Sequence, residues 1–119
     1  MKVSNYKELI VWKKSMILVK KTYEIVDRLP AYENYALSEQ MRRSAISIPS
    51  NIAEGCERES KKEFVRFLSI ANGSKSELLT QLEICKMLGY CSNIEEVEKL
   101  CQEIGKMLNS IINKLTTIH

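Results

Sequence analysis

The chain has 119 residues, of which 45% are hydrophobic and 28% are charged, and its formal net charge is +3. Four glycines, two prolines and few aromatic residues favour helices over sheets. No stretch approaches the roughly 18 apolar residues of a membrane span, and the N-terminal residues lack the pattern of a secretory signal. We therefore expect one soluble, cytoplasmic domain covering residues 1–119.

The first predicted helix covers about residues 6–28 and stops before Pro30, because the residue preceding a proline avoids helical geometry. Its apolar residues recur every three or four positions, which is the spacing of one buried helical face. This face would contain Leu9, Trp12, Met16, Val19, Tyr23 and Val26.

The same segment is basic on its other side. Its positive side chains form two adjacent rows, one of Lys7, Lys14, Lys21 and Arg28 and one of Lys13 and Lys20. These rows could follow a phosphate backbone, since each bound lysine releases a counterion. Alternatively, they are the ordinary solvent-facing side of an amphipathic helix, and only symmetric assembly would enlarge the patch.

The second predicted helix covers residues 37–56, with Ser38 as a candidate N-terminal cap. Pro49 lies inside it and predicts a kink, because proline removes one backbone hydrogen bond. Its apolar face contains Met41, Ala45, Ile48 and Ile52.

A second stripe on this helix is wholly polar, and it consists of Gln40, Arg43, Ser47, Ser50 and Glu54. Three interpretations remain open. Arg42 or Arg43 pairs with Glu54, Glu77 or another acid of the same chain and fixes the helix register. Alternatively, the stripe forms an interface with a neighbouring copy, or both arginines bind phosphate.

The third predicted helix covers residues 60–88, because Ser60 and Glu63 form a capping box and Gly89 can end a helix. Gly73 lies in its middle, which favours a close approach of another helix over a simple weak spot. Four cations gather at its start, where they either attract an anion or are merely solvated; they are Arg58, Lys61, Lys62 and Arg66.

The fourth predicted helix covers residues 93–117, with Asn93 as its cap and Glu96 three positions on. Its apolar face contains Val97, Cys101, Ile104, Leu108, Ile111, Leu115 and Ile118. The predicted loops are short, which suits antiparallel neighbours in an up-down four-helix bundle.

No residue pattern indicates catalysis. The only histidine is the terminal His119, and no glycine-rich phosphate loop is present. The four cysteines have irregular spacing and no Cys-x-x-Cys pair; Cys85 and Cys101 fit a helical core and Cys91 a turn. We expect no enzyme, no catalytic residue, no metal and no cofactor.

Several strings resemble those of a known family over nearly the whole chain. They are Gln40-x-Arg42-Arg43, Ser47-Ile48-Pro49-x-Asn51-Ile52-Ala53-Glu54-Gly55, Arg58, Phe67-Leu68-x-Ile70-Ala71-x-Gly73-Ser74 and Glu77-Leu78, with Leu9-x-Val11-Trp12 and Tyr23 before them. The chain thus resembles the bacterial four-helix-bundle proteins encoded in intervening sequences of large-subunit ribosomal RNA genes. The accessory variability protein of diversity-generating retroelements is a relative of that family.

The resemblance implies an all-α, antiparallel bundle assembled as a ring-like homopentamer. It also implies a basic scaffold that binds RNA or DNA with little sequence specificity, with a reverse transcriptase as one candidate partner. The matching nucleic-acid-binding residues would be Lys13, Lys14, Lys20, Lys21, Arg42 and Arg43. The oligomer interface would contain Gln40, Arg43, Ser47, Ser50 and Glu54. The alternative function is a protein–protein assembly module without nucleic-acid binding.

Overall fold

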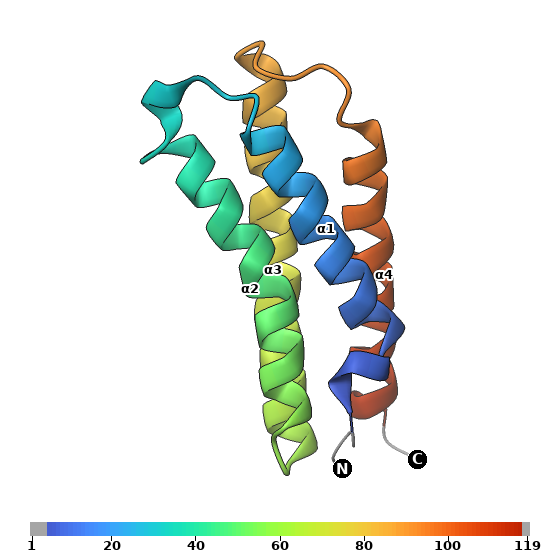
Figure 1. Ribbon diagram of the computed structural model, residues 1–119. Coiled ribbons are helices and arrows are strands. Elements are labelled where there is room, and N and C mark those ends of the chain that lie inside the picture. Colours follow the sequence, from blue (N-terminus) through green and yellow to red (C-terminus); the bar gives the residue numbers. More distant parts are fainter. Residues whose placement is uncertain (1–4, 118–119) are drawn as a thin grey trace.

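The computed structural model describes residues 5–117, and their regular structure is entirely helical (Figure 1). The four α-helices are α1 (Ile10–Val26), α2 (Leu37–Cys56), α3 (Lys61–Met87) and α4 (Glu95–Thr116). Two short 3₁₀ turns, η1 (Tyr6–Glu8) and η2 (Ala31–Glu33), precede α1 and α2. The predicted all-α class with four helices is confirmed.

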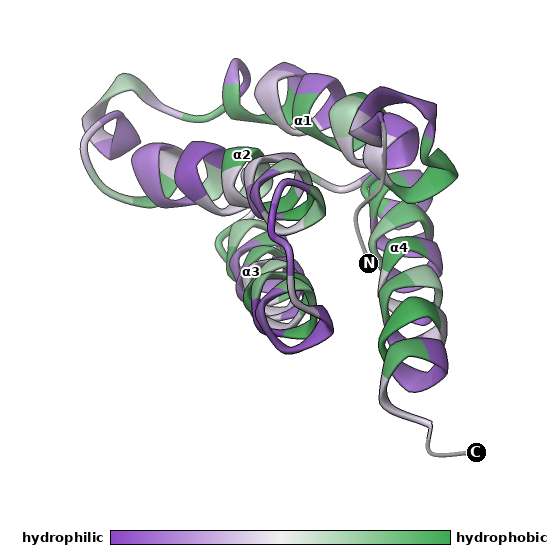
Figure 2. Ribbon diagram, turned by 90° about the horizontal axis from the view of Figure 1, so that it is seen from below, coloured by the Kyte–Doolittle hydropathy of each residue, from purple (hydrophilic) through white to green (hydrophobic). Residues whose placement is uncertain are grey.

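Each helix packs against two others: α1 and α3 both contact α2 and α4. Seen along its length, the molecule has α1 lying between α2 and α4, with α3 beside α2 (Figure 2). Hydrophobic and hydrophilic stretches alternate along every helix in that view, as expected when one side of each helix is buried. All four helices contribute fully buried side chains to one core, including Leu18, Ile48, Leu68 and Ile104.

The first helix differs from its prediction at both ends. Leu9 is extended, with φ −70° and ψ 128°, and it separates the turn η1 from α1. The side chain of Asn5 accepts a hydrogen bond from the backbone N–H of Lys7, which caps η1 separately. The helix then ends at Val26, not at residue 28.

The predicted buried face of this helix was also wrong in register, except at Val26, which is buried as expected. The residues that α1 buries are Val11, Ser15, Leu18, Thr22, Ile25 and Val26. Ser15 and Thr22 can be buried because their hydroxyls donate to the backbone carbonyls of Val11 and Leu18, at 2.7 and 2.8 Å. A neighbouring apolar stripe, which we call the outer stripe, consists of Trp12, Met16, Val19 and Tyr23 and remains wholly or partly at the surface.

The second helix occupies the expected range, and its predicted apolar face of Met41, Ala45, Ile48 and Ile52 is fully buried. Figure 1 shows α2 bending along its length, and Pro49, which cannot donate a backbone hydrogen bond, lies buried within it. Ser38 is not the cap, because the helix already begins at Leu37 and Ser38 is buried in its first turn.

The third helix begins and ends at the predicted signals. The hydroxyl of Ser60 accepts a hydrogen bond of 3.1 Å from the backbone N–H of Glu63. At the other end Gly89 has φ +77°, and the N–H groups of Gly89 and Tyr90 bind the carbonyls of Lys86 and Cys85. This is the paired hydrogen-bond pattern that commonly closes helices at glycine.

The glycine that allows close packing is Gly55, not Gly73. A Cβ atom on Gly73 would meet nothing within 4 Å, so the predicted close approach at this position is wrong. On Gly55 it would lie 2.9 Å from the Cβ of Phe67 and 3.0 Å from a ring carbon of Phe64. Gly55 therefore lets the end of α2 pack directly on the start of α3.

The fourth helix begins two residues later than predicted. Ile94 occupies the cap position without a side-chain hydrogen bond, so Asn93 is not the cap, and Glu96 instead binds a lysine of α1. Val97, Cys101, Ile104 and Leu108 are buried as expected, while Ile111 and Leu115 are half-buried. Ile118 lies outside the described residues.

Candidate functional site

An open hydrophobic groove lies between α1 and α2, and we call it the α1–α2 groove. It has a volume of about 340 Å³ and is lined by Tyr6, Trp12, Met16, Val19, Ile46, Pro49, Ser50 and Ala53. Trp12, Met16 and Val19 of the outer stripe form one wall, and the side of α2 that carries Ile46 and Pro49 forms the other. Met16 is 45% exposed and Ile46 is 43% exposed, which is unusual for large apolar side chains next to each other.

The wall of this groove is organised by aromatic packing. The rings of Tyr6 and Trp12 meet edge to face, with their centroids 5.4 Å apart. The break at Leu9 lets η1 fold back and bring Tyr6 against the helix that follows it. Trp12 is the only tryptophan of the chain, so the groove carries a single intrinsic fluorophore of this kind.

The predicted polar stripe of α2 is divided between two hollows. Gln40, Arg43 and Ser47 line a polar hollow of about 360 Å³ between α2 and α3, together with Ser44, Ser74 and Glu77. Ser50 and Glu54 instead line a hollow of about 380 Å³ beside Tyr6. The stripe thus faces both α3 and the region of the α1–α2 groove.

Within the polar hollow, the hydroxyl of Ser47 is the centre of a hydrogen-bond network. It accepts from the hydroxyl of Ser74 at 2.8 Å and from the amide nitrogen of Asn51 at 2.9 Å. The Ser74 contact joins α3 to α2 directly. Part of the polar stripe therefore serves packing within one chain.

Neither arginine of α2 pairs with Glu54 of the same helix or with Glu77 of α3; the acid that Arg43 approaches is Glu39. Arg43 lies 3.7 Å from Glu39 on the same helix, and Arg42 donates to the backbone carbonyl of Asn34 at 3.1 Å. Neither contact can fix the register between two helices.

Two of the lysines predicted to bind nucleic acid are ion-paired with α4. Lys14 lies 2.8 Å from Glu103, and Lys21 lies 2.6 Å from Glu96. The hydrogen bond with Glu96 and its negative charge raise the pKa of Lys21, and the same contact lowers the pKa of Glu96. These lysines therefore connect α1 to α4 at the surface.

Lys13 and Lys20 lie on the exposed side of α1 and make no ion pair with any described residue. The six predicted residues thus fall into three groups: Lys13 and Lys20 facing solvent, Lys14 and Lys21 facing α4, and Arg42 and Arg43 on α2.

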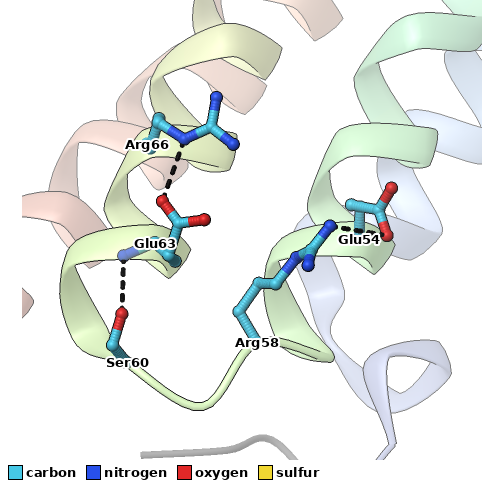
Figure 3. Close-up of polar contacts among 5 residues, drawn as sticks. All are labelled: Glu54, Arg58, Ser60, Glu63 and Arg66. Atoms are coloured by element: carbon cyan, nitrogen blue, oxygen red, sulfur yellow. Dashed lines mark hydrogen bonds and ion pairs between the residues drawn. The ribbon is translucent and has the colours of Figure 1, made fainter.

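The two arginines of the cationic cluster at the start of α3 are paired with acids (Figure 3). Arg58 lies 3.5 Å from Glu54, and Arg66 donates to Glu63 at 3.0 Å. The hydrogen bond from Arg66 lowers the pKa of Glu63. Both guanidinium groups also stack near the ring of Phe67, at 4.9 and 4.6 Å from its centroid. The arginines thus stabilise the α2–α3 turn.

A hydrogen-bond network that was not expected from the sequence joins the α1–α2 and α3–α4 connections. Tyr90 donates to Glu33 at 2.8 Å, and its hydroxyl lies 3.2 Å from that of Tyr32. The hydrogen bonds with Tyr32 and Glu33 raise the pKa of Tyr90. Tyr35, by contrast, is 93% exposed, so it does not pack over the end of the bundle.

All four cysteines are free thiols. Cys56, Cys85 and Cys101 are buried, and burial raises the pKa values of Cys56 and Cys101 to about 11 and about 12. Among residues 5–117 no three histidine, cysteine or acidic side chains come together as a metal site would require. None of the described helices is long and apolar enough to cross a membrane. His119 lies outside the described residues.

The described residues define a class of protein: an all-α, four-helix domain with an exposed apolar groove and paired surface charges. A family model described as 23S rRNA-intervening sequence protein matches residues 7–110. The chain belongs to this family, as the sequence resemblance indicated.

One solved structure has a similar fold. The chain is similar to the crystal structure of a protein with unknown function from the S23 ribosomal protein family of Bacteroides thetaiotaomicron. The two share 28% sequence identity with a TM-score of 0.80, over 87% of this chain and 98% of that one. A search of curated proteins finds no match.

Proposed function

We propose that this protein is a non-catalytic, homo-oligomeric scaffold that binds RNA or DNA through phosphate contacts with little sequence specificity. The observation that carries the proposal is the outer stripe of α1. The chain's own core covers Val11, Leu18 and Ile25 and leaves Met16 and Tyr23 substantially exposed. An apolar patch beside a polar rim is typical of a surface that another protein covers.

The partner that we assign to the α1–α2 groove is a second copy of the chain. In an antiparallel up-down bundle, α1 and α2 are neighbours and present one continuous face to another protomer. Ser50, which lines the groove, and the nearby Glu54 could hydrogen-bond across the interface. The ring-like homopentamer that the family resemblance implies would repeat this contact around a closed ring.

Lys13 and Lys20 supply the phosphate contacts in this proposal. Both are exposed and lack a carboxylate partner among the described residues, so binding a phosphate breaks no ion pair. Two lysines per chain make a weak site, but assembly would multiply them and strengthen the local potential. The family name associates these proteins with 23S rRNA genes, which supports a nucleic-acid context.

The second candidate function is an assembly module without nucleic-acid binding. The observation in its favour is that Lys14 and Lys21 are already paired with Glu103 and Glu96. In this alternative the groove retains its role and the lysines only stabilise the fold. Both candidate functions are compatible with a further protein partner such as a reverse transcriptase.

Molar mass in solution tests the assembly step. The wild-type protein should exceed its monomer mass of 13.7 kDa at micromolar concentration. Met16→Glu places a charge in the groove and should shift the protein to monomer. Ile17→Glu is a matched control, because Ile17 is 49% exposed on the same helix but does not line the groove. A wild-type monomer, or equal effects of the two variants, would refute the assigned interface.

A further inference from the structure

The connection between α3 and α4 brings two thiols together. The sulfur atoms of Cys85 and Cys91 lie 2.9 Å apart, with the Cys91 thiol donating to the Cys85 sulfur. A disulfide bond is about 2.05 Å long, so roughly one ångström of movement would join them. Of the four cysteines, these are the two that contact each other; Cys56 and Cys101 lie separately in the core.

The backbone explains why the two thiols meet. Gly89 adopts φ +77° and ends α3, and the N–H of Tyr90 then binds the carbonyl of Cys85 at 3.0 Å. This hydrogen bond turns the chain back over the last turn of α3. Cys91 follows directly and comes to rest against Cys85. The helix end therefore brings the backbones of the two cysteines close together.

We propose that Cys85 and Cys91 form an oxidisable pair, a modification site that closes to an intrachain disulfide on exposure to a hydroperoxide. Cys91 is partly exposed and lies in the α3–α4 connection, so an oxidant can reach it, whereas Cys85 is buried. Burial, followed by the contact with Cys91, raises the pKa of Cys85 to about 12, which supports Cys91 as the first thiol to react.

The chemistry proceeds in two steps. Cys91 releases its proton and its sulfur attacks the peroxide, so that an S–O bond forms and the O–O bond breaks; the departing oxygen takes up the released proton and leaves as water or alcohol. The sulfur of Cys85 then attacks the Cys91 sulfur, the S–O bond breaks, and the departing hydroxide takes the Cys85 proton and leaves as water. The two thiols lose two electrons and two protons in total, and the hydroperoxide accepts them.

The disulfide would restrict the end of the molecule where the α1–α2 and α3–α4 connections contact each other. Tyr90 lies between the two cysteines, and its hydroxyl donates to Glu33 of η2. Holding Cys91 against α3 restricts Tyr90 and so favours its contact with the α1–α2 connection. This site is separate from the α1–α2 groove and does not depend on the proposed function.

Peptide mapping of the full chain tests the proposal directly. Cleavage after lysine and arginine places each cysteine in a different peptide: residues 44–58, 76–86, 87–99 and 100–106. After hydrogen peroxide and alkylation of the remaining thiols, we expect residues 76–86 linked to residues 87–99, with the loss of two hydrogen atoms. The melting temperature should rise by roughly 5 °C and return on reduction.

The variants separate this disulfide from other oxidation products. Cys91→Ser should abolish both the linked peptides and the rise in melting temperature, whereas Cys56→Ala should keep both. Three results would overturn the proposal: no linked peptides, a link between residues 87–99 of two chains, or stable over-oxidation of Cys91 with Cys85 still reduced.

Discussion

Ser74 of α3 donates a 2.8 Å hydrogen bond to the hydroxyl of Ser47 on α2, and this contact lies within the polar stripe that the sequence offered as a binding surface. Ser74 is 6% exposed, so water cannot easily replace its partner. The hydrogen bond shows that a regular polar stripe can serve the packing of its own chain.

Ser74→Ala should destabilise the protein by about 1 kcal/mol, because a mostly buried hydrogen bond is lost. Ser76→Ala provides the control, since Ser76 is exposed on the same helix and the two changes alter helix propensity equally. The difference between the unfolding free energies of the two variants, measured in urea, gives the contribution of the Ser47–Ser74 hydrogen bond. Equal stabilities of the two variants would mean that the Ser47–Ser74 bond contributes nothing.

Gly73→Ala should stabilise the protein by about 1 kcal/mol, because the added methyl group meets open space in a helix. Gly55→Ala should instead destabilise it by about 1–3 kcal/mol, since the new Cβ would overlap Phe64 and Phe67. Denaturant unfolding of both variants checks the contrast. A destabilising Gly73→Ala would point to a neighbour at that position which the single chain lacks.

The pair of Lys21 and Glu96 should contribute to stability only within a pH window. The pKa of Glu96 is lowered from 4.5, so its contribution is complete above that value and is lost as pH falls through the folded-state pKa. The pKa of Lys21 is raised from 10.5, so its contribution is complete below 10.5 and is lost as pH rises through the higher folded-state pKa. Glu96→Gln should therefore lower the melting temperature at neutral pH but not in strong acid.

Glu95→Gln is the matched control for this pH dependence, because Glu95 is an exposed neighbour at the start of α4 that makes no ion pair with a described residue. Melting temperatures from acid to neutral pH give the comparison. If the melting temperatures of Glu96→Gln and wild type differ by the same amount at every pH, the ion pair is not the cause of the difference.

Nucleic-acid binding, if present, should depend more on the unpaired lysines than on the paired ones. Replacing Lys13 and Lys20 with glutamine should weaken binding and reduce the salt dependence by about one unit of slope per lost contact. The same replacement of Lys14 and Lys21 should have less effect, because their charges are balanced by Glu103 and Glu96.

Fluorescence anisotropy with labelled single-stranded RNA and duplex DNA, between about 50 and 200 mM salt, measures both effects. The measurement requires the assembled protein. Absence of binding at the lowest salt would remove nucleic acid from the proposed function and leave the assembly module.

The sequence predicted part of what depends on local signals: the caps proposed at Ser38 and Asn93 were wrong, whereas both ends of α3 were right. Ser60 and Gly89 mark the ends of α3 because capping involves only neighbouring backbone groups. The family assignment also came from the sequence, because its characteristic strings extend along most of the chain. These features need no knowledge of how the helices pack.

The register of α1 could not be predicted in the same way. Two stripes with equal spacing run along this helix, and counting apolar residues favours the one with Trp12 and Tyr23. The structure buries the stripe with Ser15 and Thr22, since hydroxyls bound to their own helix lose little on burial. The pairs of Lys14 and Lys21 with α4 likewise exist only once the helices have packed.

The tight contact of Gly55 with Phe64 and Phe67 bears on the order in which the chain folds. Only residues 57–60 connect α2 to α3, so the contacts between these helices close short loops, and such contacts form early in folding. A bulky residue at position 55 should therefore slow refolding more than it speeds unfolding, which stopped-flow kinetics can measure. The α2–α3 hairpin would then be the nucleus on which the first and last helices assemble.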